Sequence, residues 1–154
     1  MKYFLITLGI LCLVLNSNAQ IVRVENAKYF DNKHELYNGL YTEYYDNGNK
    51  KLEMYLVNGE QDSTTFLYND SGRIYETRSY KHGLMHGKWE TFNNNGKKIA
   101  EAWYRNDQKD GVWRIWDENG ILRFEMPYSN GQRISVWKKF NENGDLESEH
   151  SYGF

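Results

Sequence analysis

The sequence predicts an all-β protein: an elongated antiparallel meander of stacked β-hairpins, built from about five repeats of 24 residues. The first reason is a strict glycine period, which is formed by Gly48, Gly72, Gly96, Gly120 and Gly144. A fixed period of this length indicates one supersecondary unit that has been copied and stacked. The second reason is composition, because 13 Tyr, 7 Phe and 5 Trp stand against a single Pro. Flat rings pack well on a pleated surface, so this composition favours strands.

Residues 1–19 lie outside the period and predict a secretory signal peptide. An apolar run covers residues 3–15, and the small residues Ser17 and Ala19 precede a predicted cleavage site before Gln20. The run is short for a membrane anchor, since a helix needs about 20 apolar residues to cross a bilayer. We therefore expect an exported bacterial protein, periplasmic, in the cell envelope or secreted, with no integral membrane span after cleavage.

Cleavage would also remove Cys12, the only cysteine in the sequence. Lipid attachment at Cys12 is disfavoured, because Leu11 precedes it where such signals carry a small residue. The mature chain would have no disulfide, so its stability must come from packing. Without Lys2 it would carry 18 basic and 21 acidic side chains, a net charge of −3. This balance argues against nucleic acid or an anionic membrane as the main partner.

The rest of the chain divides into a lead-in segment, residues 20–38, and a repeat array, residues 39–154. The approximate copies are residues 39–62, 63–86, 87–110, 111–134 and 135–154. Each copy opens with a short aromatic run, such as residues 111–116, followed by Asn or Asp and then the periodic glycine. This pattern predicts a strand that meets a hairpin turn, in which glycine adopts the positive φ that other residues resist. In the lead-in, residues 21–24 and 27–30 could form strands that cover the first edge of the array.

A second strand follows each turn. Every second residue of 122–128 is apolar, which is the period of a strand with one buried face and one wet face. A further turn ends each copy, marked by Gly59, Gly83 and Gly131 and, in one copy, by Asp107. Consecutive hairpins should pair edge to edge, so that about ten strands form a ribbon roughly 45 to 50 Å long. No segment after residue 19 has the spacing of an amphipathic helix, so we expect almost no helix.

One copy carries a recognisable signature of Gly-x-Trp-x-x-aromatic, then Asn and Gly, then Glu and Tyr. Its residues are Gly111, Trp113, Trp116, Asn119, Gly120, Glu125 and Tyr128. With this signature the chain resembles the bacterial variant of the MORN repeat, of which many members are labelled YwqK-type antitoxins. The resemblance covers residues 39–154 and implies an all-β array of hairpins used for binding, without catalysis. The second copy departs from it, with Ser63, Thr65 and Thr77 in place of Gly, Trp and Glu.

Periodic carboxylates raise the question of acid–base catalysis. They are Glu53, Glu101, Glu125 and Glu149. A catalytic pair needs two different environments to separate its pKa values, whereas equivalent positions of a repeat share nearly the same environment. We expect cross-strand ion pairs on the polar face instead. The expected partners are Lys88, Arg114 and Lys138.

His82 and His86 are four residues apart, the spacing that places two imidazoles on one helical face in zinc sites. They fall where the repeat predicts a connection, not a helix, so we expect no metal. The Asn and Asp turns lack the order of an EF-hand loop, and turn chemistry explains them. His34 and His150 receive no role. No Ser/His/Asp or Cys/His arrangement is evident, so we expect neither an enzyme nor a cofactor.

Aromatic rings at the repeat period are the main binding candidates. Tyr41, Trp89, Trp113 and Trp137 should stack across the sheet, as should Tyr80, Tyr104, Tyr128 and Tyr152. Trp103, Trp116 and Phe140 fall on other registers and should line the opposite face, and Trp116 joins the first two sets as a candidate. A thin sheet must bury something, so the rings could simply form the core. Alternatively, one row stays partly open as a groove for a peptide, a glycan or a cation.

These features predict an exported, non-enzymatic repeat protein that binds another protein or acts as a scaffold through an extended aromatic and polar sheet surface. A cell-wall or glycan-binding module that uses the aromatic rows is one alternative. An antitoxin or immunity-like protein that binds a toxin is another. The features that distinguish this protein from a regular repeat array should lie where the 24-residue period is broken. The breaks are Ser63, Thr65, Thr77, Asp107 and Ser135.

Overall fold

The computed structural model describes residues 23–153, and this part of the chain is all β with no helix. The predicted signal peptide lies outside the described residues. The strands are β1 (Arg23–Glu25), β2 (Lys28–Phe30), β3 (Gly39–Tyr44), β4 (Lys50–Val57), β5 (Glu60–Tyr68), β6 (Ile74–Lys81), β7 (Leu84–Phe92), β8 (Lys98–Arg105), β9 (Gln108–Lys109), β10 (Gly111–Trp116), β11 (Leu122–Ser129), β12 (Gln132–Arg133), β13 (Ser135–Phe140) and β14 (Leu146–Tyr152).

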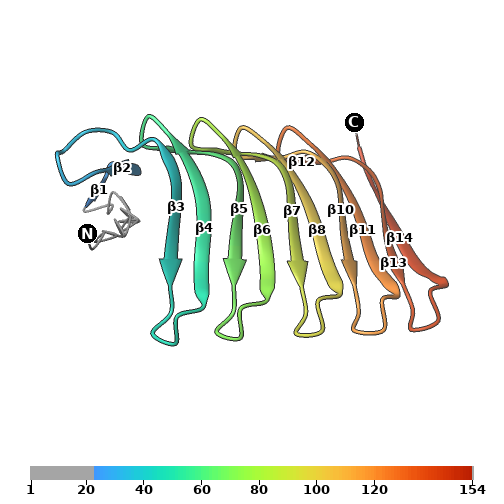
Figure 1. The fold of residues 1–154 in the computed structure, drawn as a ribbon. Helices are drawn as coiled ribbons and strands as arrows, with labels where there is room; N and C mark the ends of the chain where they lie inside the picture. Colours follow the sequence, from blue (N-terminus) through green and yellow to red (C-terminus); the bar gives the residue numbers. More distant parts are fainter. Residues whose placement is uncertain (1–22, 154) are drawn as a thin grey trace, which may run out of the picture.

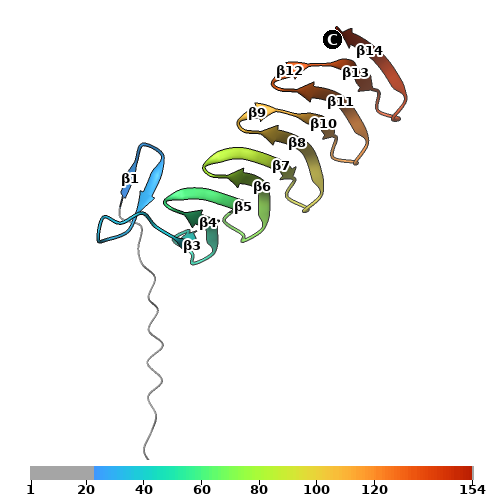
Figure 2. The same ribbon diagram turned by 90° about the horizontal axis from the view of Figure 1, so that it is seen from above.

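Twelve of these strands form one long antiparallel sheet, which confirms the predicted meander. Its order from one end to the other is β14-β13-β11-β10-β8-β7-β6-β5-β4-β3, and the short β9 and β12 extend it beside β8 and β11. Figure 1 shows the hairpins side by side in sequence order, and the view from above in Figure 2 shows that the strands curve. Each strand therefore contacts mainly its neighbours in sequence, as in other repeat proteins.

The hairpin turns have the geometry that their glycines predict. The φ angles of the five periodic glycines lie between 75° and 87°. In the third copy, Gly96 donates its N–H to the carbonyl of Asn93 at 2.9 Å. The Asn93 side-chain oxygen then accepts the N–H groups of Asn95 and Lys97, each at 3.0 Å. Asn or Asp before the glycine therefore closes the turn with its own side chain.

The second set of connections consists of two-residue turns with positive φ at both positions, the pattern of type I′ hairpins. Asp107 keeps this conformation without being glycine, with a φ of 66°. Its backbone N–H donates to the carbonyl of Met85 at 3.0 Å, and its side chain accepts the Met85 N–H at 2.7 Å. This extra hydrogen bond to the preceding copy compensates for the lost glycine.

Strands β1 and β2 form the predicted N-terminal strands as a separate two-stranded sheet, which is not paired with β3. Asn26 and Ala27 both have positive φ, so the segment turns back on itself. The Tyr29 N–H donates to the carbonyl of Gly59 at 2.9 Å, which ties this small sheet to the first connection of the array. Within the described residues, β3 therefore remains the end strand of the long sheet.

Alternation along the strands gives the long sheet two unlike faces. We call the side that carries Trp113 the ladder face and the side that carries Trp116 the strip face. Both residues belong to β10, and they face opposite sides because they are three residues apart in the strand. The most buried side chains described all lie on the ladder face. They are Met54, Leu56, Thr65 and Tyr128. The core of the protein is therefore one face of a single curved sheet.

Candidate binding surfaces on the two sheet faces

The predicted Trp and Tyr candidates combine into one continuous row on the ladder face, which we call the aromatic ladder. From one end to the other it contains Tyr80, Trp89, Tyr104, Trp113, Tyr128, Trp137 and Tyr152. Successive ring centroids are 4.8 to 6.3 Å apart, and the rings are tilted by 50° to 59°. We expected separate Trp and Tyr stacks, and the structure shows alternation instead. Tilted contacts at this distance are favourable for aromatic pairs.

The reason for the alternation is a backbone irregularity at the start of each first strand. Gly111 pairs with Tyr128 and has a φ of 80°. A side chain added at Gly111 would point toward Trp103, away from the ladder. No side chain therefore separates the Tyr128 ring from the Trp113 ring on the diagonal. Ser63 and Ser135 also have positive φ in their copies, 71° and 57°, so these two breaks in the period keep the left-handed backbone conformation.

The ladder is interrupted in the second copy. Leu56 and Thr65 occupy the ring positions one period before Tyr80 and Trp89, and both are among the most buried residues. Tyr41, a predicted site residue, consequently does not reach this row. Its ring lies 6.4 Å from that of Tyr29, in the small N-terminal sheet.

Basic side chains lie over the ladder rings, and sequence reasoning did not predict them. The Lys109 ammonium lies 4.2 Å from the Trp113 centroid and 4.8 Å from the Tyr128 centroid. One period later, the Arg133 guanidinium lies 4.7 Å from the Trp137 centroid. These distances are those of cation–π contacts. The sequence carried one signal of these contacts: the basic residues Lys109 and Arg133 are one 24-residue period apart, as the ladder rings are.

The polar atoms of the ladder are also mostly used internally. Trp113 Nε1 donates to the Trp103 carbonyl at 3.0 Å, and Trp137 Nε1 donates to the Pro127 carbonyl at 3.2 Å. Trp89 Nε1 is the exception among the described buried side-chain nitrogens and oxygens, since it has no hydrogen-bond partner. Burial raises the pKa of the Tyr104 phenol. The ladder therefore packs chiefly against itself.

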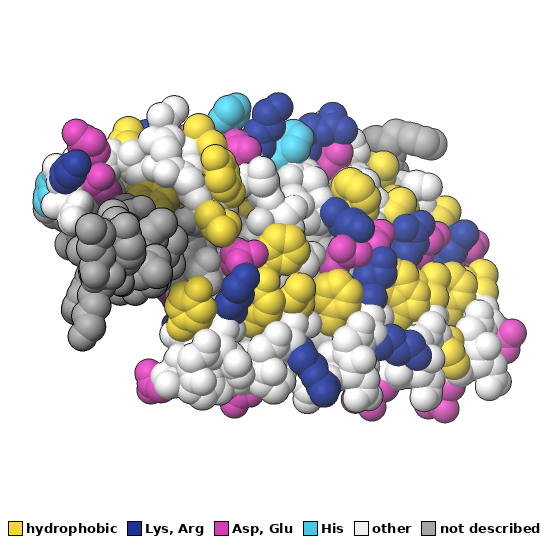
Figure 3. Space-filling view, viewed as in Figure 1, with side chains coloured by type: hydrophobic (Ala, Val, Ile, Leu, Met, Phe, Trp, Pro, Cys, Tyr) yellow, Lys and Arg dark blue, Asp and Glu magenta, His cyan; other side chains and the backbone are white. Residues whose placement is uncertain are grey.

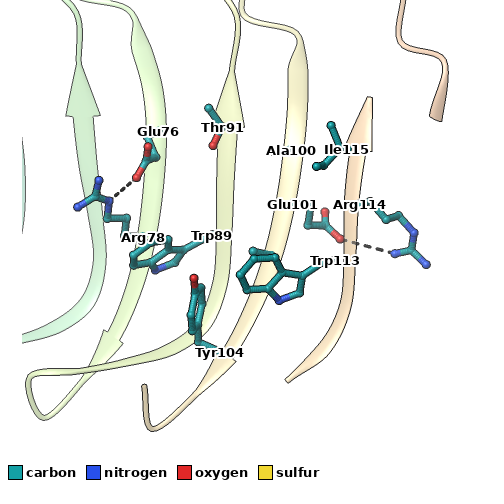
Figure 4. A pocket seen from close by; sticks show the side chains of 11 residues that line it. Glu76, Arg78, Trp89, Thr91, Ala100, Glu101, Tyr104, Trp113, Arg114 and Ile115 are labelled. Carbon is teal, nitrogen blue, oxygen red and sulfur yellow. Dashed lines mark hydrogen bonds and ion pairs between the residues drawn. The ribbon is translucent and has the colours of Figure 1, made fainter. Parts of the chain in front are cut away.

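One part of the ladder face is hollowed. Ala100 and Ala102 form a small-residue floor beside Trp89 and Trp113, where other copies carry larger side chains. The hollow has a volume of ≈ 380 Å³. Figure 4 shows the rings of Trp89, Tyr104 and Trp113 side by side, with Arg78 next to Trp89. Arg78 also forms an ion pair with Glu76, so the positive charge at this end of the hollow is balanced by a carboxylate that lines the same hollow.

Charged residues form a row along the middle of the strip face, as we expected for the periodic glutamates. Arg114 contacts Glu125 at 3.0 Å and Glu101 at 3.8 Å. The other expected partners differ: Lys88 pairs with Glu90 at 3.0 Å, and no described carboxylate pairs with Lys138. The lysine closest to Glu101 is Lys98, at 2.6 Å.

The environment of Glu101 does not suit a general acid. Burial acts to raise the pKa of its carboxyl, but the hydrogen bond and charge of Lys98, together with the Trp103 hydrogen bond and the charge of Lys88, outweigh burial and hold the pKa below its ordinary value. A general acid near neutral pH needs the opposite shift. Glu53 is bound in the same way by Lys50, three residues before it. These carboxylates act in ion pairs.

A second row of rings lies on the strip face next to the hairpin turns, and we call it the aromatic strip. Its rings are Tyr44, Tyr68, Phe92, Trp116 and Phe140, and their cross-strand partners are Lys50, Ile74, Lys98, Leu122 and Leu146. Tyr44 and Leu146, at the two ends, are 58% and 52% exposed. Figure 3 shows this row of hydrophobic side chains, with a band of charged side chains above it. Of the predicted binding residues, only Trp116 belongs to the strip.

Two lysines lie beside rings of this strip. The Lys98 ammonium lies 5.2 Å from the Trp116 ring centroid, and the Lys50 ammonium lies 5.9 Å from that of Tyr68. Both lysines are also paired with glutamates of the charged row. The strip is therefore a mixed apolar and polar band that runs along all five copies on a face with no covering layer among residues 23–153.

A sequence comparison decides the family. The model of the MORN repeat variant matches residues 37–58, 85–106, 109–130 and 135–152, more than half of the chain. The chain belongs to the MORN repeat variant family. The family match identifies the repeat and does not support the narrower YwqK-type label. No curated protein matches the sequence.

The unmatched stretch between residues 58 and 85 corresponds to the second MORN repeat variant copy. This copy contains Ser63, Thr65 and Thr77, the departures noted in the sequence. The structure nevertheless pairs its strands β5 and β6 in the same way as the other hairpins. The second copy therefore keeps the backbone of the MORN repeat and changes its surface.

Two solved structures resemble this MORN repeat chain in part. One is a variant of TarM from S. aureus in complex with Fondaparinux, alpha-GlcNAc-glycerol and UDP, with 16% identity, a TM-score of 0.39 and coverage of 77% of this chain and 21% of that chain. The other is accessory secretory protein 1, 2 and 3 of Streptococcus pneumoniae, with 11% identity, a TM-score of 0.40 and coverage of 77% and 22%. The chain spans about a fifth of each protein's length, and we draw nothing about function from either.

The histidine pair at the end of the second MORN copy, His82 and His86, has structural contacts. The backbone N–H of His82 donates to Asp62 Oδ2 at 3.2 Å, and His86 Nδ1 lies 3.1 Å from Asn106 Oδ1. The first contact joins this copy to the preceding one, and the second joins it to the following one. Among residues 23–153, no group of three His, Cys, Asp or Glu side chains could hold a metal ion. Within the same range, no helix is long and apolar enough to cross a membrane.

Proposed function

We propose that this protein is an exported, non-enzymatic repeat protein that binds another protein through the aromatic strip. The observation that carries the proposal is the strip itself: rings from all five copies, lysines between them and exposed apolar residues at both ends, on an uncovered sheet face. Interfaces favour aromatic side chains surrounded by polar groups. Neutralisation of a toxin would be one form of such binding.

The ladder is a weaker candidate for the same role. Its rings contact one another at about 5 Å, and Lys109 and Arg133 lie over them. A partner that bound there would have to replace the contacts of Lys109 and Arg133 with the rings by contacts of its own. The strip rings instead have no ring contacts among the described residues beyond their own lysines. The strip is thus the surface on which a partner adds contacts without removing existing ones.

The experiment compares two neighbouring residues of β10 that face opposite sides. The mature chain, residues 20–154, is immobilised and used to capture proteins from a bacterial envelope extract. Trp116→Glu places a charge in the strip, and Ile115→Glu places the same charge on the ladder face, where Ile115 is 40% exposed. We expect Trp116→Glu to reduce capture of a specific protein by at least about tenfold. Ile115→Glu should retain capture.

Thermal unfolding of both variants is the control that checks whether they remain folded. The proposal is wrong if both variants capture the same proteins as the unchanged chain, or if only Ile115→Glu loses them. The second result would move the binding surface to the ladder face.

A glycan-binding module is the second candidate, and the hollow beside Trp89 and Trp113 favours it. Aromatic walls around a small-residue floor can stack against a sugar ring. Titration with soluble peptidoglycan fragments, followed by tryptophan fluorescence, tests this function. Saturable quenching that is lost in Ala102→Met, which places in the hollow the side chain found at Met54 and Met126, would support it. Unchanged fluorescence would reject it.

A further inference from the structure

A second hollow lies on the strip face, between two neighbouring hairpin turns. Its volume is ≈ 640 Å³. Tyr68 and Phe92 of the strip form its walls, and Ile74 and Thr77 lie between them. The two hairpin turns line the rest of the hollow through Gly72, Asn95 and Gly96. This volume lies in the range of sites that take small ligands.

The hollow exists because the second copy breaks the period. Copies one and three carry a lysine and a glutamate three residues apart, Lys50 with Glu53 and Lys98 with Glu101, and both are ion pairs. At the same two positions the second copy has Ile74 and Thr77. The shorter, uncharged pair leaves space between the rings and removes the carboxylate. An apolar, acid-free hollow thus stands between two ion-paired copies.

Arg73 is the one cation that lines this hollow. Its Nη1 donates to the backbone carbonyl of Asn94 at 2.7 Å, which holds the side chain across the two turns. No described carboxylate lies within ion-pair distance of its guanidinium, in contrast to Arg78 and Arg114. A guanidinium has five N–H donors, so most remain available. The rim of the hollow therefore presents an uncompensated positive charge next to an apolar interior.

We propose that this hollow is the specificity pocket of the strip. It takes one apolar side chain of a partner protein, and Arg73 pairs with a carboxylate adjacent to that side chain in the partner. The inference rests on the proposed function, because it names the chemistry that the strip selects. Charge complementarity supports it: an acidic group next to the anchor gains Arg73 and meets no carboxylate in the hollow. Elsewhere on the strip, the same group would meet the row of glutamates.

The test uses a small probe in place of the unidentified partner. N-acetyl-phenylalanine supplies a ring next to a carboxylate, and N-acetyl-phenylalaninamide supplies the same ring without the charge. Both are titrated into the mature chain, labelled with nitrogen-15, and amide shifts are followed by NMR. We expect saturable shifts at Gly72, Ile74, Thr77 and Gly96. The acid should bind about three- to tenfold more tightly than the amide.

Three variants separate the parts of the pocket. Arg73→Gln should abolish the preference for the acid while the amide still binds. Ile74→Lys with Thr77→Glu reproduces the residues of copies one and three, so the chain should fold and lose both probes. Lys97→Gln is the matched control, because Lys97 occupies the position of Arg73 in the next turn and reaches the Glu118 carbonyl instead. It should leave both affinities unchanged.

The inference is overturned if the acid and the amide bind equally to the unchanged protein, if their shifts map elsewhere, or if the double variant still binds. Its failure is distinguishable from failure of the proposed function. If the probes do not bind but Trp116→Glu still loses its captured protein, the strip binds a partner without this pocket. If the probes bind as expected but Trp116→Glu loses nothing, the pocket stands as a site and the wider strip does not.

Discussion

The rings of Trp113 and Tyr128 lie 5.2 Å apart between centroids, on a diagonal across the pair formed by Gly111 and Tyr128. The same relationship recurs in the third and fifth copies, between Trp89 and Tyr104 and between Trp137 and Tyr152. Each tryptophan therefore contacts the tyrosine of its own hairpin and that of the preceding one. The ladder joins consecutive repeats through these contacts.

We expect Trp113→Ala to lower the free energy of unfolding by about 2 to 4 kcal/mol, because it removes two ring contacts and a hydrogen bond in the middle of the ladder. Urea unfolding followed by circular dichroism measures the change. Trp103→Ala is the control, since Trp103 is 40% exposed on the strip face. It should cost about 1 kcal/mol or less. Equal costs would show that the ladder is not the core.

Two glycines with similar φ should respond differently to alanine. Gly96 has a φ of 75° with nothing within 4 Å of an added Cβ, so Gly96→Ala should cost about 1 kcal/mol from backbone conformation alone. Gly59 has a φ of 72°, and its added Cβ would lie 2.7 Å from the Tyr29 carbonyl oxygen. Gly59→Ala should therefore cost at least about 1 kcal/mol more than Gly96→Ala, because the backbone must also move. Urea unfolding of both variants tests the difference, and a larger cost at Gly96 would contradict the contact between the small sheet and the array.

The Tyr41 phenol should ionise far above the ordinary range. Burial, together with the hydrogen bond that it donates to Glu43, raises the pKa of Tyr41 to about 12. The unfolded chain loses this proton near its ordinary value of 10.0, so the folded state binds more protons between these values. The free energy of unfolding should consequently fall as pH rises from about 10 to about 12. Ultraviolet titration of the unchanged protein and Tyr41→Phe shows whether the late-ionising phenol is Tyr41, and a Tyr41 pKa near 10 would contradict this account.

Export gives a prediction independent of the fold. When the full chain is expressed in a Gram-negative host, mass spectrometry of the periplasmic fraction should find a mature protein that begins at Gln20. Ala19→Arg should block cleavage, because the site requires a small residue there. Cytoplasmic protein with residues 1–19 intact would reject the predicted signal peptide.

Most of the fold could be predicted because its determinants are local. Positive φ at Gly48 or Gly120 and the side-chain hydrogen bonds of Asn93 act within five residues, so composition and period were sufficient to place turns and strands. The site was less predictable. Lys98, not Lys88, is the lysine that contacts Glu101. The register between β7 and β8 shifts between Thr91 and Phe92, and this irregularity turns the start of β8 toward the strip face.

The 24-residue period alone established the hairpin, its repetition and the alternation of two faces, since each depends on interactions within a copy or with the next one. Three-dimensional packing decided how the faces differ. Rings that the sequence places in separate rows meet in one ladder because the backbone at Gly111 directs a side chain away from them. Lys109 and Arg133 cover that ladder, while Trp116 remains on the open face. These outcomes depend on backbone irregularities and diagonal contacts between strands, which the spacing of residues along the chain does not encode.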